Sequence, residues 1–138
     1  MKIAVVDGQG GGLGKAIIEK LSKEVKGEAY IIALGTNAMA TASMFRAGAD
    51  EGATGANAII FTADKVDIIV GSVAILAANA MLGEFSPRMA EAIGSSSAKK
   101  ILIPLNRCHI EVVGTKDGSL PQLIDLAVSR VKEICKKL

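Results

Sequence analysis

Aromatic side chains are scarce in this 138-residue sequence, which has no tryptophan, one tyrosine and three phenylalanines. Half of the residues are nevertheless hydrophobic, so the chain is able to bury a core made of alanine and branched aliphatic side chains. Such small side chains allow close contact between helices and a sheet. They also leave apolar surface of the kind that subunits bury against each other, and we therefore expect a homo-oligomer.

An excess of charge of one sign is also lacking. The 16 basic and 14 acidic residues give a net charge of +2, which does not suit a nucleic-acid-binding surface. Lys99-Lys100 and the lysines of residues 132–137 have no interleaved aromatic residues on which bases could stack, so we interpret them as solvated ends of elements. The uncharged stretch 68–83 is shorter than the roughly 20 apolar residues of a membrane helix. We expect neither nucleic acid nor a membrane as a partner.

Metal-binding and nucleophilic residue types are few. Cys108, Cys135 and His109 are too few for a zinc site. Cys108 and His109 are adjacent, so in a strand their side chains would point to opposite faces and make a poor nucleophile–base pair. We therefore assign no catalytic residue and no metal ligand. Few cysteines and no signal peptide predict a reduced, cytoplasmic location.

Glycine, in contrast, is concentrated in "DGQGGGLGKAI", residues 7–17, with five glycines between Gly8 and Gly14. Each costs roughly 0.5–1 kcal/mol of stability relative to alanine, and a turn alone needs only one or two. The stretch links a predicted buried strand at 3–6 to a predicted helix at 13–24. Free backbone N–H groups and the helix dipole favour an anion at such a junction, where side chains would obstruct a phosphate.

Apolar runs and helical spacing alternate along the rest of the chain. The short link before residues 109–113 permits a hairpin with the preceding strand but no helical crossover. The alternation predicts a three-layer, Rossmann-like α/β fold over residues 1–138 as one domain, with a mostly parallel sheet of about five strands and helices on both faces. The predicted strands are 3–6, 29–34, 66–70, 100–104 and 109–113, the helices are 13–24, 37–47, 56–63, 73–82, 86–93 and 120–138, and residues 48–55 are a loop.

The loops that follow parallel strands gather at one edge of a sheet, where such folds bind ligands. The candidate ligand-binding residues are therefore Asp7, Gly8, Gln9, Gly10, Gly11, Gly12, Leu13, Gly14, Thr36, Asn37, Gly71, Ser72 and Asn106. Alternatives stay open for the last five, because Thr36, Asn37 and Ser72 could act as helix caps. The turn at residues 106–109 could be an ordinary polar turn, and Glu84 is expected on the surface.

The spacing of the glycines excludes two common phosphate-binding patterns. Leu13 breaks G-x-G-x-x-G, and Gln9 and Ala16 break G-x-x-x-x-G-K-[ST]. The variant G-x-x-x-G-[IL]-G fits at residues 8–14, and over roughly the first 25 residues the chain resembles the cofactor loop of short-chain dehydrogenases/reductases. That resemblance implies NAD(P) or another nucleotide as a ligand.

The rest of the dehydrogenase pattern is missing. Those enzymes use a Tyr-x-x-x-Lys pair, whereas Leu34 follows Tyr30 here. No acidic residue follows the strand at 29–34 to hold a ribose, so ribose contacts would come from Thr36 or Asn37. We expect nucleotide binding without dehydrogenase chemistry.

Over its full length the chain resembles a family of small bacterial Rossmann-like proteins known as a domain of unknown function. The resemblance is carried by "DGQGGGLGKAIIEKL", "IALGTNAMAT", "GADEGATGANAI", "DIIVG", "ANAMLGEFSPRMAEAI" and "KKILIPLNRC". It implies the fold and a bacterial cytoplasm, and no reaction.

Three functions remain open. The first is a module that binds a small phosphorylated ligand at the glycine-rich loop. The second is a small enzyme acting on such a ligand, with Asp7, Asn106 or Arg107 in the site. The third is an oligomeric interaction protein, in which the glycines serve only close packing and the apolar helix 73–82 forms an interface.

Overall fold

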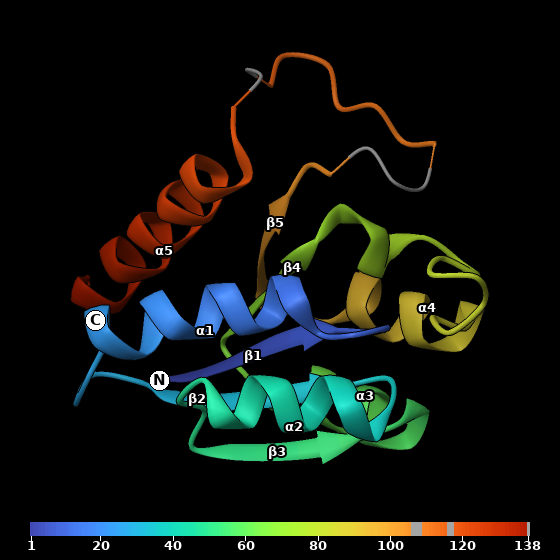
Figure 1. The fold of residues 1–138 in the computed structure, drawn as a ribbon, viewed down its shortest axis with the longest axis horizontal. Helices are drawn as coiled ribbons and strands as arrows, with labels where there is room; N and C mark the ends of the chain where they lie inside the picture. Colours follow the sequence, from blue (N-terminus) through green and yellow to red (C-terminus); the bar gives the residue numbers. More distant parts are fainter. Residues whose placement is uncertain (106–108, 116–117, 138) are drawn as a thin grey trace.

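Five parallel strands form one sheet in the order β3-β2-β1-β4-β5 (Figure 1). The structure, a computed structural model, describes residues 1–105, 109–115 and 118–137. In the centre of the sheet, Val5 pairs with Ala33 on one side and with Val70 on the other. The strand order reverses between β1 and β4. The strands are β1 (Lys2–Asp7), β2 (Tyr30–Gly35), β3 (Glu51–Thr54), β4 (Ile68–Ser72) and β5 (Lys99–Ile103).

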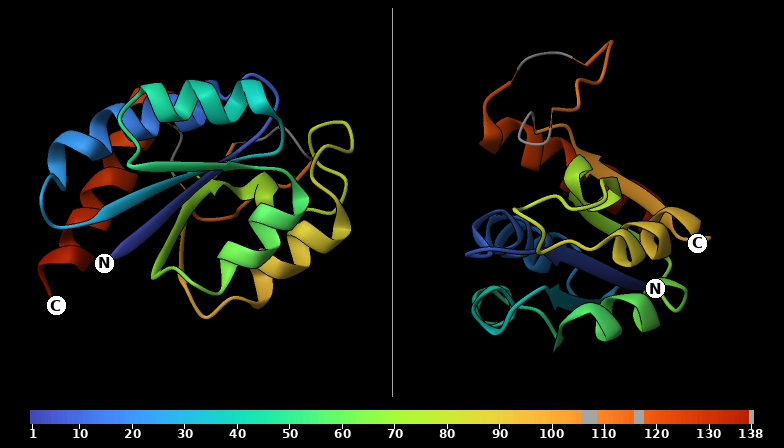
Figure 2. Two further views of the ribbon diagram at one scale, coloured as in Figure 1. Left: turned by 90° about the horizontal axis from the view of Figure 1, so that it is seen from below. Right: turned by 90° about the vertical axis from the view of Figure 1, so that its right-hand side faces the viewer.

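Helices cover both faces of the sheet (Figure 2). One face carries α1 (Gly12–Glu24), α2 (Ala38–Arg46) and α5 (Leu120–Lys136), and the other carries α3 (Ala56–Ala63) and α4 (Pro87–Ser95). Alternate residues of β1 serve the two cores: Ile3 and Val5 belong to the first, and Ala4 and Val6 to the second. The fold is therefore the predicted three-layer Rossmann-like α/β fold.

Local signals place most of the elements. Asn37 begins α2 by accepting a hydrogen bond from the Ala40 N–H at 3.0 Å. Ser86 caps α4 in the same way, and Pro87 occupies its first turn, as predicted.

Among the described residues, no helix is long and apolar enough to cross a bilayer.

Three predicted elements are wrong. Residues 51–54, expected in a loop, form the edge strand β3, which pairs with β2 through its backbone. The predicted helix 73–82 is only a single 3-10 turn, η1 (Val73–Leu76), because Asn79, Met81 and Leu82 adopt the left-handed backbone conformation. Residues 109–113 form no strand and are largely exposed, so β5 has no hairpin partner there.

Candidate functional site

A cavity of about 670 Å³ opens at the carboxyl ends of β1 and β4, where the strand order reverses. This is the position at which open α/β sheets bind ligands. We call it the switch-point cavity. Its walls come from the glycine-rich loop (residues 7–13), from Ser72 and Ala74 after β4, from the turn at Met81 and Leu82, and from Leu105 and Leu120 on the approach to α5.

The glycine-rich loop is a tight turn that leads from β1 directly into α1. The Gly11 N–H donates to the Gly8 carbonyl at 2.9 Å, and Gln9 and Gly11 both have positive φ, 51° and 75°. The carboxylate of Asp7 accepts hydrogen bonds from the N–H groups of Gly8 and Gly14, each at 2.8 Å. Asp7 thus takes the third N–H of α1 and ties the helix to the strand that precedes it.

Three other backbone N–H groups of the loop have no hydrogen-bond acceptor among the described residues. No described residue accepts a hydrogen bond from the backbone N–H of Gly10, Gly12 or Leu13. All three residues line the switch-point cavity, and Gly12 and Leu13 form the first turn of α1. The N-terminus of a 13-residue helix adds a partial positive charge at this point.

Three of the five glycines are explained by packing. A Cβ atom at Gly11 would lie 2.8 Å from the Ala40 Cα atom, and the positive φ of Gly11 disfavours any side chain. A Cβ atom at Gly14 would collide with the Met44 side chain, and one at Gly8 would lie 2.6 Å from the Met81 sulfur. A side chain at any of these positions would force neighbouring atoms to move, whether or not a ligand binds.

Gly10 and Gly12 differ from the other three. A Cβ atom at either would meet nothing within 4 Å, and neither has a positive φ. Neither packing nor backbone conformation therefore requires glycine at these two positions. A side chain at either one would instead cover part of the cavity wall.

Of the predicted residues at the end of β4 or after β5, only Ser72 is found in the cavity wall among those that the structure describes. Ser72 lines the cavity, and its hydroxyl caps η1 by accepting from the Ala74 N–H at 3.2 Å. Gly71 packs against β1, since a Cβ atom there would lie 2.9 Å from the Val6 carbonyl oxygen. Asn106 lies outside the described residues, as do Arg107 and Cys108.

Thr36 and Asn37 do not line the cavity. They donate hydrogen bonds to Glu84, which is exposed, as predicted. Oε1 of Glu84 accepts from the Thr36 hydroxyl at 2.6 Å, the Gln9 N–H at 2.9 Å and the Asn37 amide at 3.0 Å. These donors, the Thr36 hydroxyl foremost, hold the pKa of Glu84 below its ordinary value of 4.5. No sequence pattern points to this contact, because Glu84 lies 47 residues from Asn37.

Polar and apolar groups both line the switch-point cavity. Leu13, Leu82, Leu105 and Leu120 present aliphatic side chains, and Asp7 is the charged residue among the described lining residues. The described residues also contain no group of three or more His, Cys, Asp or Glu side chains that could hold a metal ion. The arrangement suits a ligand with an anionic group for the N–H groups and an apolar or ring-shaped part for the wall.

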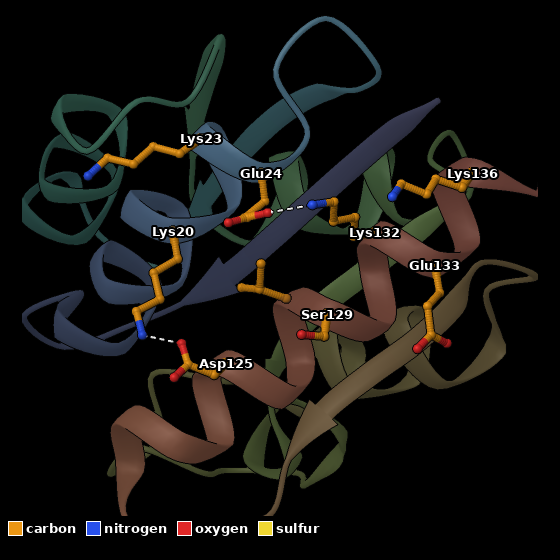
Figure 3. A pocket seen from close by; sticks show the side chains of 9 residues that line it. Lys20, Lys23, Glu24, Asp125, Ser129, Lys132, Glu133 and Lys136 are labelled. Carbon is orange, nitrogen blue, oxygen red and sulfur yellow. Dashed lines mark hydrogen bonds and ion pairs between the residues drawn. The ribbon is translucent and has the colours of Figure 1, made fainter.

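A second cavity, of about 550 Å³, lies between α1 and α5, and Figure 3 shows the charged side chains that line it. We call it the α1–α5 groove. Two ion pairs cross the groove, Lys20 with Asp125 and Lys132 with Glu24 at 2.8 Å, and Lys23, Glu133 and Lys136 also line it. Lys132 lowers the pKa of Glu24, and Glu24 raises that of Lys132. These contacts join the two helices and leave no recognisable ligand site.

Comparisons with known proteins identify the family of this chain. A family model described as a domain of unknown function, DUF3842, matches residues 2–136. No curated protein sequence matches the chain. Among solved structures, the chain is similar to a dodecameric FMN-dependent Ubix-like decarboxylase from Escherichia coli O157:H7, with 16% sequence identity and a TM-score of 0.45. That similarity covers 94% of this chain and 75% of the other.

Proposed function

We propose that this chain, which belongs to the DUF3842 family, binds a nucleotide or another small phosphorylated metabolite in the switch-point cavity. The phosphate would rest on the backbone N–H groups of Gly10, Gly12 and Leu13. The observation that carries the proposal is the pair of glycines that the fold does not need. Gly10 and Gly12 line the cavity, have open space where a side chain would be, and keep the neighbouring N–H groups accessible.

Physical chemistry favours an anion at this position. A helix N-terminus offers donors together with a favourable dipole, and glycine lets a phosphate approach the backbone closely. Asp7 already occupies the Gly14 N–H, and its negative charge disfavours an anion beside it. The phosphate would therefore sit toward Gly10 and Gly12 rather than deeper in the turn.

The alternative role of the glycines, close packing alone, accounts for only part of the loop. It explains Gly8, Gly11 and Gly14, whose missing side chains would collide with neighbouring atoms. It does not explain Gly10 and Gly12, which lose backbone entropy on folding, roughly 0.5–1 kcal/mol each relative to alanine, without a packing gain. A ligand that needs the bare backbone supplies the missing reason.

A ligand panel tests the proposal by thermal unfolding. The panel contains AMP, ATP, GTP, FMN, coenzyme A, NAD(H) and NADP(H). A ligand present at about 100 times its Kd adds about 2.7 kcal/mol to the free energy of unfolding, so the Tm should rise by several degrees. In the variant Gly12→Leu the rise should disappear, because the new side chain would cover the N–H groups of the first turn. The variant should still fold, since nothing lies within 4 Å of the new Cβ atom.

Gly94→Ala provides the matched control. Gly94 lies in α4, has no positive φ, and offers its Cβ atom only an ordinary contact with Leu76 at 4.0 Å. Its ligand-induced rise in Tm should equal that of the unmodified chain. The proposal is overturned if no phosphorylated compound raises the Tm, or if Gly12→Leu folds and responds to the ligand as Gly94→Ala does.

A further inference from the structure

The end of β2 is closed by the protein's own groups. In folds that bind dinucleotides, the second nucleoside lies beyond β2, where an acidic residue holds its ribose. Here the Thr36 hydroxyl donates to Glu84 at 2.6 Å, and the Asn37 amide donates to Glu84 at 3.0 Å and to the Gln9 carbonyl at 2.9 Å. The side-chain amide oxygen of Asn37 caps α2 by accepting from the Ala40 N–H. The Thr36 hydroxyl, the Asn37 amide and one carboxylate oxygen of Glu84 are therefore engaged within the protein.

The carboxylate reaches β2 on a turn that is fixed at its base. The Asn79 N–H donates to the Phe85 carbonyl at 2.8 Å, and the Phe85 N–H donates to the Ala80 carbonyl at 3.1 Å. Phe85 itself is completely buried. We call residues 79–85 the latch turn, because its tip is held against the glycine-rich loop by Glu84.

The latch turn holds an unfavourable backbone. Asn79, Met81 and Leu82 have φ values of 65°, 59° and 56°, a left-handed conformation that is uncommon for residues other than glycine, above all for bulky ones such as Met81 and Leu82. Leu82 is in addition 99% exposed and lines the switch-point cavity. Strain of this kind persists only where surrounding contacts enforce it, and the contacts here are those of Glu84 and of the turn's base.

Met81 completes the closure on the β2 side of the loop. A Cβ atom at Gly8 would lie 2.6 Å from the Met81 sulfur and 2.7 Å from the Thr36 hydroxyl oxygen. The space between the glycine-rich loop and the end of β2 is thus filled. Met81 also forms part of the wall of the switch-point cavity, which extends from it toward Ser72, Leu105 and Leu120.

We infer that the site takes a ligand with a single nucleotide unit and excludes dinucleotides. Its phosphate would rest on the loop at Gly10 and Gly12, and its ring would lie against the leucine side chains of the cavity. Met81 and Glu84 fill the place that the second nucleoside of a dinucleotide would need. This inference rests on the proposed function and narrows its ligand class.

Matched pairs of ligands test the inference by calorimetry on the full chain. NAD contains AMP, and FAD contains FMN, so each pair differs by the added nucleotide. For the pair that binds, the mononucleotide should bind at least tenfold more tightly than the dinucleotide. In the double variant Met81→Ala/Glu84→Ala the difference should shrink at least tenfold, because the β2 end is vacated. Glu84→Gln, which keeps the side-chain volume, should preserve most of the discrimination.

Amide chemical shifts separate the two sides of the loop. The mononucleotide should move the signals of Gly10, Gly12 and Leu13 and leave those of Thr36 and Asn37 in place. This inference alone is overturned if the unmodified chain binds a dinucleotide as tightly as its mononucleotide and Gly12→Leu abolishes that binding. Absence of binding by every nucleotide overturns this inference, and the proposed function falls with it if no other phosphorylated compound binds.

Discussion

The glycine-rich loop has two sides that use glycine for different reasons. Toward α2 and β2, the missing side chains of Gly8, Gly11 and Gly14 make room for Met81, Ala40 and Met44. Toward the switch-point cavity, the missing side chains of Gly10 and Gly12 make room for nothing in the protein. The motif therefore combines a packing device with an open surface, and only the open surface identifies a binding site.

The largest effect is expected at the most constrained packing position. Gly11→Ala should lower the free energy of unfolding by about 2–5 kcal/mol, because it forces a side chain into the left-handed conformation and against the Ala40 backbone. Gly10→Ala, one residue away, should instead raise the free energy of unfolding by about 0.4–1 kcal/mol, because alanine fits there and loses less backbone entropy on folding. Urea unfolding of both variants measures the difference. Equal stability of the two would remove the distinction between packed and open glycines.

A smaller loss is expected at Gly14, because its neighbour is a flexible side chain. Gly14→Ala should destabilise by about 1–3 kcal/mol through overpacking against Met44. Met44→Ala alone should cost about 2–5 kcal/mol, since Met44 is fully buried. The loss of stability in the double variant should be at least 1 kcal/mol smaller than the sum of the losses in the two single variants, because the new methyl group fills part of the cavity left by Met44. Strict additivity would show that Met44 is not what requires glycine at position 14.

The sequence predicted most of the sheet because buried strands appear as continuous aliphatic runs. The strands at residues 3–6, 29–34, 66–70 and 100–104 were found in this way. β3 was missed because Glu51–Thr54 has no apolar run and is held at the sheet edge by backbone bonds to β2. The apolar stretch 73–82 resembled a buried helix, but Asn79, Met81 and Leu82 adopt the left-handed conformation. The turn that they form brings Glu84 to Gln9 and Thr36, which lie more than 40 positions away in the sequence.

The candidate site was predicted in outline only. The junction of β1 with α1 and the position of Ser72 follow from local sequence. The division between packed and open glycines does not, because the neighbours of Gly11 and Gly14 belong to another helix. The contact of Glu84 with Thr36 was equally out of reach, since it depends on the path of the latch turn across the sheet edge.

A moderate, pH-dependent effect is expected at Glu84, which holds the closed side of the loop. Glu84→Gln should lower the free energy of unfolding by about 1 kcal/mol near pH 7, a small value because the carboxylate is exposed. The pKa of Glu84 is lower in the folded chain than its ordinary value of 4.5. Its contribution is therefore fully present above about pH 4.5 and is lost as the pH falls through the lowered pKa.

Denaturant unfolding between pH 3 and pH 7 tests this prediction. The stability curves of the unmodified chain and of Glu84→Gln should converge at the acidic end. Glu91→Gln, on the exposed surface of α4, serves as the control for removal of one carboxylate charge. A difference that stays constant over the whole range would contradict a charged latch.

The smallest effect is expected in the α1–α5 groove. Unlike the switch-point cavity, this groove is crossed by two ion pairs between helices. Glu24 and Lys132 meet at 2.8 Å on an exposed surface, so a double-mutant cycle with Glu24→Gln and Lys132→Met should give a weak coupling. The coupling should vanish near 1 M salt, where the screening length falls to about 3 Å. Ligand binding at the glycine-rich loop should be the same in all four proteins, because none of these changes touches the cavity. A loss of binding in the groove variants would join the two regions and contradict a site confined to the open side of the loop.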